Sequence, residues 1–328
     1  MYGSPYSIDV GDRTPATPPT RSRPRWPTST TANPTTARRA RVDGAIGMAS
    51  ARYHGAGMRR LIVNADDLGL SGAVNDGIFE AHKNGIVGSA TCLVTLEGWE
   101  DAVARLAVHD ALDVGLHLNL TWGRPAHGAA LPSLAPNGRF RGKRGLAVAL
   151  SLGRVSRDEL RAEIAAQLQV FTDRLGAPSH VDVHQHLHAF EPVWETLLEV
   201  AREAQVPWLR FPAERASGSL VTRWVGRRFR RRNRPPAPTR TTDHFRGIGL
   251  AGRLDEDSLL TILRDLPDGL TELMTHPGGP DPSPTHPDRL AGARRGELGA
   301  LTAASAREAV DAEGIILTTF SAEAARAE

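Results

Sequence analysis

Cysteine is nearly absent from this sequence, which has Cys92 as its one cysteine among 328 residues. That scarcity excludes an internal disulfide framework and a cysteine-rich zinc site. It also suits a reducing compartment, so we expect a cytoplasmic protein. Long apolar runs are absent as well, because none approaches the ~18 residues that a membrane span requires. We therefore expect a globular protein without a membrane span.

A strong excess of charge of one sign is also missing. Lysine and arginine number 40, aspartate and glutamate 37, and the net charge is +3. Much of the basic character is local, in the N-terminal region and in RRFRRRNRPPAPTR at 227–240. Arginine runs bind phosphates without sequence preference, which makes a nucleic-acid-binding protein one alternative. No recognised nucleic-acid motif accompanies the run, and we do not predict nucleic acid as a partner.

Residues 1–57 differ in composition from the rest of the chain. They are rich in Pro, Thr and Arg and have no apolar periodicity. Such a segment cannot bury enough apolar surface to offset the entropy lost on ordering it. We predict a disordered extension at 1–57 and a single catalytic domain at 58–328, with Met58 as the natural start.

From Met58 onward, patterns typical of strands alternate with patterns typical of helices, which predicts an α/β fold with a mostly parallel sheet, open or closed into a barrel. Ser71 is expected to cap one helix, and Ser156 with Glu159 to form a capping box on another. Insertions are expected near 123–155, as a long loop, and near 215–250. The expected strands are 60–65, 86–95, 113–121, 180–190, 207–212, 270–276 and 315–321, with a loop at 277–279. The expected helices are 72–85, 98–110, 157–175, 192–205, 256–266 and 297–314.

Two adjacent aspartates, Asp66 and Asp67, end the first expected strand. An unpaired buried carboxylate is costly, and neighbouring side chains on a strand point to opposite faces. The pair therefore indicates a functional site in which the two carboxylates have different tasks.

The segment HVDVHQHLH at 180–188 is the most unusual part of the sequence. Strict alternation would place four histidines and an aspartate on one strand face. A solvated edge strand is the structural alternative, but a core has no use for such a face, so we predict metal binding or acid–base chemistry. The aspartate could fix the tautomer of a ligating imidazole. The residues in question are His180, Asp182, His184, His186 and His188.

Further polar residues fall at the ends of other expected strands: His117 and Asn119, Arg210, and His276. In α/β folds, sites are built where the carboxyl ends of parallel strands meet. We therefore predict that these residues and the aspartate pair form one site.

This set of side chains favours hydrolysis of an amide or ester. One carboxylate and two histidines suit a catalytic divalent metal with open positions. A second carboxylate can act as general base, and a further histidine can protonate the leaving group. The alternative enzyme is a glycosidase with paired carboxylates. Its two acids should lie on different strands, which adjacent aspartates fit poorly.

Four motifs in this order resemble the YdjC-like carbohydrate deacetylases, which include chitooligosaccharide deacetylase and the hopanoid-biosynthesis-associated deacetylase. They are LIVNADDLGLSGAVNDGIFEAHKNGIVGSATCLV, VGLHLNLTWGRP, HVDVHQHLHAFEPV and TELMTHPGG, and the resemblance covers roughly Arg59 to Ser321. It implies an irregular (β/α) barrel of the polysaccharide-deacetylase kind. It also implies removal of acetyl groups from N-acetylated sugars, small or oligomeric, with a divalent metal that is usually magnesium, zinc being the alternative.

The resemblance also implies roles for individual residues. Asp67, His117 and His184 match the metal ligands, Asp66 the general base and His276 the general acid, and Arg210 would orient the base. Leu68 stands where the family commonly has phenylalanine, an apolar exchange that leaves the chemistry intact. A homodimer is among the assemblies that the sequence allows. We also expect three further residues to contact the substrate. The expected substrate-binding residues are His186, His188 and Asn119.

Overall fold

The computed structural model describes residues 57–215, 219–279 and 288–326. The extension expected at 1–57 therefore lies, except for its last residue, outside the described residues.

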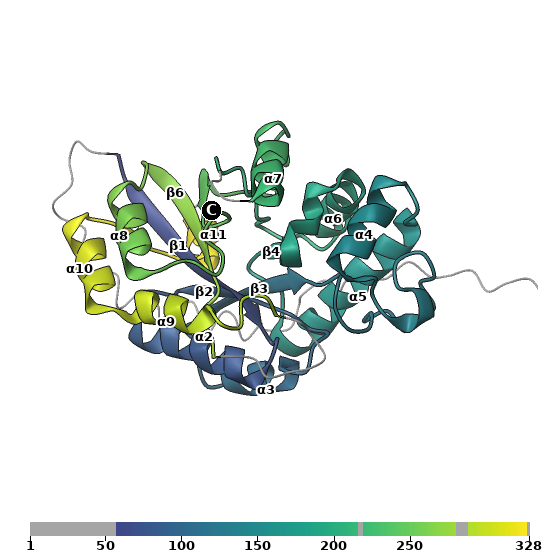
Figure 1. Ribbon diagram of the computed structural model, residues 1–328, viewed down its shortest axis with the longest axis horizontal. Helices are drawn as coiled ribbons and strands as arrows, with labels where there is room; N and C mark the ends of the chain where they lie inside the picture. Colours follow the sequence, from purple (N-terminus) through teal and green to yellow (C-terminus); the bar gives the residue numbers. More distant parts are fainter. Residues whose placement is uncertain (1–56, 216–218, 280–287, 327–328) are drawn as a thin grey trace, which may run out of the picture. The chain divides into compact units, whose positions relative to one another are not determined.

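A curved sheet of parallel strands forms the centre of the fold (Figure 1). Its order is β4-β3-β2-β1-β6-β5, and β7 pairs with the start of β1 on the side where β2 has not yet begun. The strands β1 and β6 are buried along most of their length, since helices cover the sheet. The strands are β1 (Arg59–Leu68), β2 (Ser89–Cys92), β3 (Asp113–Leu118), β4 (Val181–Val183), β5 (His244–Arg246), β6 (Gly269–Thr275) and β7 (Ile316–Leu317).

The segment 207–210 reduces the gap between the edge strands β4 and β5. The backbone of Val181 in β4 exchanges hydrogen bonds with Trp208 and Arg210, and Leu209 donates to the carbonyl of Arg240, four residues before β5. These bridges bring the sheet toward closure and direct Arg210 into its interior. The prediction of an irregular (β/α) barrel is confirmed.

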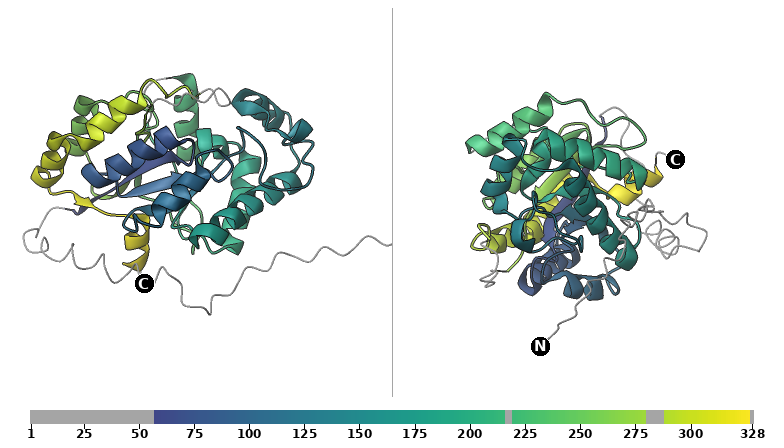
Figure 2. Two further views of the ribbon diagram at one scale, coloured as in Figure 1. Left: turned by 90° about the horizontal axis from the view of Figure 1, so that it is seen from below. Right: turned by 90° about the vertical axis from the view of Figure 1, so that its right-hand side faces the viewer.

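Helices surround the sheet on its outer side, as the two views of Figure 2 show. Two of them, α4 and α7, lie within the segments that we expected to be insertions, and α4 corrects the expectation of a long loop at 123–155. The helices are α2 (Gly72–Asn84), α3 (Trp99–Leu106), α4 (Gly142–Ser151), α5 (Arg157–Leu175), α6 (Glu191–Glu203), α7 (Leu220–Arg230), α8 (Glu256–Arg264), α9 (Arg294–Thr302), α10 (Ala304–Ala312) and α11 (Phe320–Ala325), with short 3₁₀ turns η1 (Pro136–Gly138) and η2 (His184–Ala189).

The helix caps agree with the sequence in part. The Ser71 hydroxyl accepts the N–H of Val74, and the Ser156 hydroxyl accepts that of Glu159. The second half of the expected capping box is wrong, because the Glu159 carboxylate does not return to Ser156. It accepts instead the N–H groups of Ser133 and Leu134, and so fastens the 123–155 segment to the start of α5.

The strand expected at 180–190 is the main error of the sequence-based fold. The strand ends at Val183, because Gln185 and His186 adopt left-handed backbone angles, with φ of 56° and 57°, and the chain turns into η2. Alternation along a strand cannot continue through such a turn. His186 and His188 therefore do not share a strand face with His184.

No helix in the described ranges has both the length and the apolar character needed to cross a bilayer.

Helix α2 and the loop after β6 approach each other so closely that glycine is required. A Cβ atom on Gly77 would lie 2.3 Å from the Cα of Gly278, two residues after His276. We expect Gly77→Ala to lower the free energy of unfolding by about 1–3 kcal/mol, because backbone atoms must move apart. Urea denaturation measures this.

The matched control is Gly72→Ala in the same helix, where no heavy atom lies within 4 Å of the added Cβ. We expect it to be neutral or stabilising by up to about 1 kcal/mol, as Ala is the better helix former. Equal stabilities of the two variants would contradict the close approach.

Candidate active site

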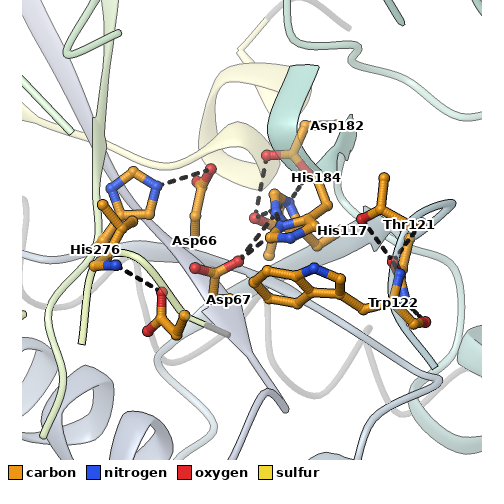
Figure 3. A network of polar contacts seen from close by, with 12 residues as sticks. Asp66, Asp67, His117, Thr121, Trp122, Asp182, His184 and His276 are labelled. Carbon is orange, nitrogen blue, oxygen red and sulfur yellow. Dashed lines mark hydrogen bonds and ion pairs between the residues drawn. The ribbon is translucent and has the colours of Figure 1, made fainter. Parts of the chain in front are cut away.

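Six predicted residues meet at the carboxyl ends of the strands, and Figure 3 shows all of them except Arg210. β1 supplies two aspartates, β3 one histidine, the first residue of η2 a second histidine, and the chain after β6 a third, while the arginine comes from the bridging segment 207–210. All six are buried. They are Asp66, Asp67, His117, His184, His276 and Arg210.

Three potential ligand atoms form a small triangle. The Asp67 Oδ1 atom lies 3.3 Å from His117 Nε2 and 3.1 Å from His184 Nδ1, and the two nitrogens are 3.1 Å apart. Asp67 Oδ1 is buried and has no hydrogen-bond partner among the described residues. One ion at ~2.0–2.2 Å from each atom would keep them about 3 Å apart. The donor set therefore fits a divalent cation.

The two imidazoles of this triangle have different electrostatic surroundings. His117 Nδ1 lies 2.5 Å from Asp182 Oδ1, which leaves Nε2 facing Asp67. Burial lowers the pKa of His117, but Asp182, Asp67 and Asp66 outweigh it and raise the pKa to about 10. Without a cation His117 is therefore protonated on both ring nitrogens near neutral pH, and a metal cation attracted by the same carboxylates would displace the Nε2 proton. Burial lowers the pKa of His184, which favours the neutral imidazole that binds metals.

An unusual backbone conformation points both aspartates into the site. Asp67 has a φ of 72°, and the pairing of β1 with β2 shifts register between Ala65 and Leu68. A regular strand would send the two side chains to opposite faces. The irregularity places them side by side, Asp67 toward the two histidines and Asp66 toward His276 (Figure 3). Left-handed angles are costly for residues other than glycine, so the surrounding contacts must hold Asp67 in place.

Arg294 of helix α9 provides such a contact. Its Nη2 atom donates to Asp67 Oδ2 at 2.6 Å, and its Nε donates to Asp288 at 2.6 Å. The guanidinium thus occupies the second oxygen of Asp67 and leaves Oδ1 for the histidines. Burial raises the pKa of Asp67, but Arg294, His117 and His184 prevail and lower it well below its usual range.

Arg210 is surrounded by three carboxylates. Its two terminal nitrogens each contact Asp66 at 2.6 Å, Nη1 also contacts Asp182 at 2.5 Å, and Nε donates to Glu272 at 2.6 Å. Burial would raise the pKa of Asp66, but Arg210 outweighs burial and holds it below its usual range. Asp66 is therefore ionised and fixed in orientation.

The aspartates separate His276 from the two histidines of the triangle, His117 and His184 (Figure 3). Its Nε2 is 3.9 Å from Asp66 Oδ2. Glu297 of helix α9 accepts the backbone N–H of His276 at 2.6 Å and places a carboxylate oxygen 3.8 Å from Nδ1. Asp66 and Asp67 therefore lie between His276 on one side and the pair His117 and His184 on the other (Figure 3).

Of the residues predicted to contact substrate, Asn119 is already engaged, whereas His186 and His188 have buried ring nitrogens without a hydrogen-bond partner among the described residues. The ring of His188 packs 4.8 Å from that of Phe229, and His186 lies edge-on to Phe245 at 6.5 Å. Asn119 uses its amide to hold the following loop, donating to Trp122 O and accepting from its N–H. The role of these three residues in substrate binding stays a prediction.

The sequence analysis missed three residues of the site. Arg294 and Glu297 face inward from α9, and Trp122 packs its indole 4.4 Å from the ring of His184. A signal for the first two existed, because they are spaced by three residues and fall in the buried stripe of α9 with Leu301. Charged residues in a buried stripe indicate partners that must be found elsewhere in the fold.

The comparisons with known proteins agree with one another. A model of the family described as YdjC-like protein matches residues 60–312. The carbohydrate deacetylase of Brevibacillus brevis is 36% identical over 265 residues, covering 80% of this chain and 98% of that protein. The human carbohydrate deacetylase is 35% identical, covering 79% of this chain and 89% of its own length. The chitooligosaccharide deacetylase of Proteus mirabilis is 34% identical, covering 79% and 97%.

A solved structure has the same fold. It is an Enterococcus faecalis V583 protein to which cleavage of cellobiose phosphate is attributed. It is 25% identical, covers 80% of this chain and 98% of its own, and has a TM-score of 0.64.

Glu272 gives the site a testable pH dependence. Burial raises its pKa from 4.5 to about 7, although Arg210 opposes the shift. The folded protein then keeps a proton that the unfolded chain releases, so this contribution to stability is complete below pH 4.5 and is lost as the pH rises through about 7. Glu272→Gln cannot ionise. As the pH rises from 4.5 through about 7, we expect the free energy of unfolding of the variant, relative to that of the wild type, to increase by up to about 3 kcal/mol.

Chemical denaturation at a series of pH values measures this difference. Glu308→Gln, on the exposed side of α10, controls for the loss of one carboxylate. A stability difference between Glu272→Gln and wild type that stays constant from acid to neutral pH would refute the assignment.

Proposed function

Since the chain belongs to the YdjC-like protein family, we propose that it is a metal-dependent carbohydrate deacetylase that hydrolyses the acetamido group of an N-acetylated amino sugar. The names of its relatives support the reaction, because they are carbohydrate and chitooligosaccharide deacetylases. The observation that carries the proposal is the triangle of Asp67, His117 and His184 beside Asp66 and His276. Amide hydrolysis requires a ligand set that leaves coordination positions of the metal open, as three protein ligands do, and an adjacent acid–base pair.

The metal would be held by Asp67 Oδ1, His117 Nε2 and His184 Nδ1. When bound there, a divalent ion supplies polarisation of the amide carbonyl and activation of water. Two imidazoles and one carboxylate favour zinc or another first-row ion by donor chemistry. The resemblance implies magnesium, and reconstitution with each ion separates the two.

Asp66 would act as the general base. Arg210 keeps it ionised and orients both of its oxygens, so it can accept the proton of the attacking water. Because Arg210 also makes the protonated form unfavourable, the proton would not remain there. It would pass to Nε2 of His276, 3.9 Å away, and from there to the amine, which is the leaving group.

His276 would protonate that amine. Its Nε2 faces Asp66 at 3.9 Å, while Glu297 holds its backbone in place. The acid would thus lie across the aspartate pair from the metal, and the scissile bond would lie between them. The indole of Trp122 beside His184 offers an apolar face against which a sugar ring could pack.

The test is acetate release from diacetylchitobiose and other N-acetylated amino sugars. We expect a chelator to abolish release and an added divalent ion to restore it. Asp67→Asn keeps the shape of the side chain but is a poor ligand, and we expect it to lower kcat/KM at least about 100-fold. Asp76→Asn is the matched control. This aspartate of α2 is exposed, and it pairs with Arg105 and not with a residue of the triangle.

Release that is insensitive both to chelator and to Asp67→Asn would refute the metal role. New reducing ends without acetate would favour the glycosidase alternative.

A further inference from the structure

Helices α4 and α7 both pack against η2, the turn that begins with the candidate ligand His184. Both lie at the periphery of the barrel and come from segments far apart in the sequence (Figures 1 and 2). The ring of Phe229 in α7 lies 4.8 Å from that of His188, and Trp224 lies 5.1 Å from Phe190. Whatever binds these helices would therefore be next to the candidate active site.

Each helix exposes apolar side chains that its packing against the protein leaves uncovered or, for Trp224, half covered. In α7, Val225 and Phe229 are buried, whereas Leu220, Val221 and Trp224 are 80%, 53% and 42% exposed. The exposure of these three is not an ordinary surface feature, because most large apolar side chains of the described residues are buried. The corresponding residues of α4 are Val148 and, just after its end, Leu152, which are 59% and 56% exposed.

These five residues account for most of the exposed large apolar side chains. Within the described part of the chain, only Met58 and Val108 lie elsewhere. We call the set Val148, Leu152, Leu220, Val221 and Trp224 the apolar rim.

Positive charge accompanies the apolar rim on both helices. Neither 138–156 nor 219–240 contains an aspartate or glutamate, although the net charge of the whole chain is only +3. The ion pairs that these segments form among the described residues involve Arg228 and Arg232 alone, both with Glu191. The exposed basic residues include Arg139, Arg144 and Arg154 around α4 and Arg223, Arg227 and Arg231 on and just after α7. Arg232 and Arg234 instead turn to the protein, Arg232 over the rings of Trp194 and Phe229 and Arg234 to the carbonyls of Thr242 and Asp243.

We propose that α4 and α7 dock the protein onto an anionic phospholipid membrane, with the apolar rim in the lipid interface and the arginines on the headgroups. Interfacial helices combine apolar side chains, tryptophan among them, with a cationic polar face. Acidic lipids attract basic clusters that carry no acids. Contacts to nucleic-acid phosphates need the arginines but not exposed Leu220 and Val221. The pattern therefore fits a bilayer better than a nucleic acid.

The proposal has a consequence for the substrate, and this consequence rests on the proposed function. Because η2 connects the docking helices to His184, docking would hold the active site at the membrane. The substrate class that fits is an amino sugar whose acetamido group is presented on a lipid.

Vesicle co-sedimentation of the full chain tests the docking directly. We expect binding to vesicles of phosphatidylcholine with phosphatidylglycerol, little binding to pure phosphatidylcholine, and weakening by salt. The triple variant Leu220→Ser, Val221→Ser, Trp224→Ser keeps every arginine, and we expect its partition coefficient to fall at least about tenfold. Val108→Ser is the matched control, as Val108 is 76% exposed outside the rim.

A charge variant tests the second half of the surface. We expect Arg227→Gln with Arg231→Gln to weaken binding to the anionic vesicles several-fold, and Arg295→Gln, on the exposed side of α9, to leave it unchanged. Thermal unfolding verifies that each variant is folded. Equal vesicle binding by the wild type and the folded triple variant would overturn the proposal. So would a wild type that binds duplex DNA but no vesicles.

Failure of the proposed function looks different in these experiments. Vesicle binding without acetate release from any N-acetylated sugar, lipid-linked or soluble, would refute the deacetylase and leave the docking intact.

Discussion

One buried guanidinium, that of Arg210, joins the parts on which the candidate site depends. It contacts carboxylates from β1, β4 and β6, namely Asp66, Asp182 and Glu272. A buried arginine is tolerated only when its donors are paired, and buried carboxylates likewise need a cation. Through Asp66 this ion cluster fixes the proposed base, and through Asp182 it sets the tautomer of His117. The segment 207–210 that brings the arginine there is also the one that narrows the gap between β4 and β5.

The sequence predicted much of the fold and most of the site's members. Strand and helix alternation gave the parallel sheet, and the strand-end positions brought Asp66, Asp67, His117, Arg210 and His276 together as expected. Such residues are predictable because the carboxyl ends of parallel strands meet at one edge whatever the detailed packing. His184 also lies in the site, but as the first residue of a turn and not as part of an alternating strand.

What the sequence did not reveal depends on backbone irregularity and on distant partners. Asp67, Gln185 and His186 have left-handed backbone angles. None of them is a glycine, so the sequence contains no signal for this conformation. These angles exist because surrounding contacts impose them, such as the Arg294 bond to Asp67. Arg294 and Glu297 were not predicted because they contact Asp67 and His276, which belong to other elements. Only the folded barrel brings these residues together. The apolar rim was equally hidden, since which face of α4 and α7 is covered depends on tertiary packing.

The ion pair between Asp67 and Arg294 spans 227 residues of the chain. During synthesis from the N-terminus, β1 precedes the arginine partners of both its aspartates. Asp66 can pair once Arg210 has been made, but Asp67 can pair with Arg294 only when nearly the whole barrel has been made. Contacts of such long range form late in folding, after the loop entropy between them has been lost. A site whose carboxylate is oriented by so distant an arginine cannot act as a nucleus for folding. A chain truncated before α9 would leave Asp67 without this arginine and its left-handed backbone angle without this support.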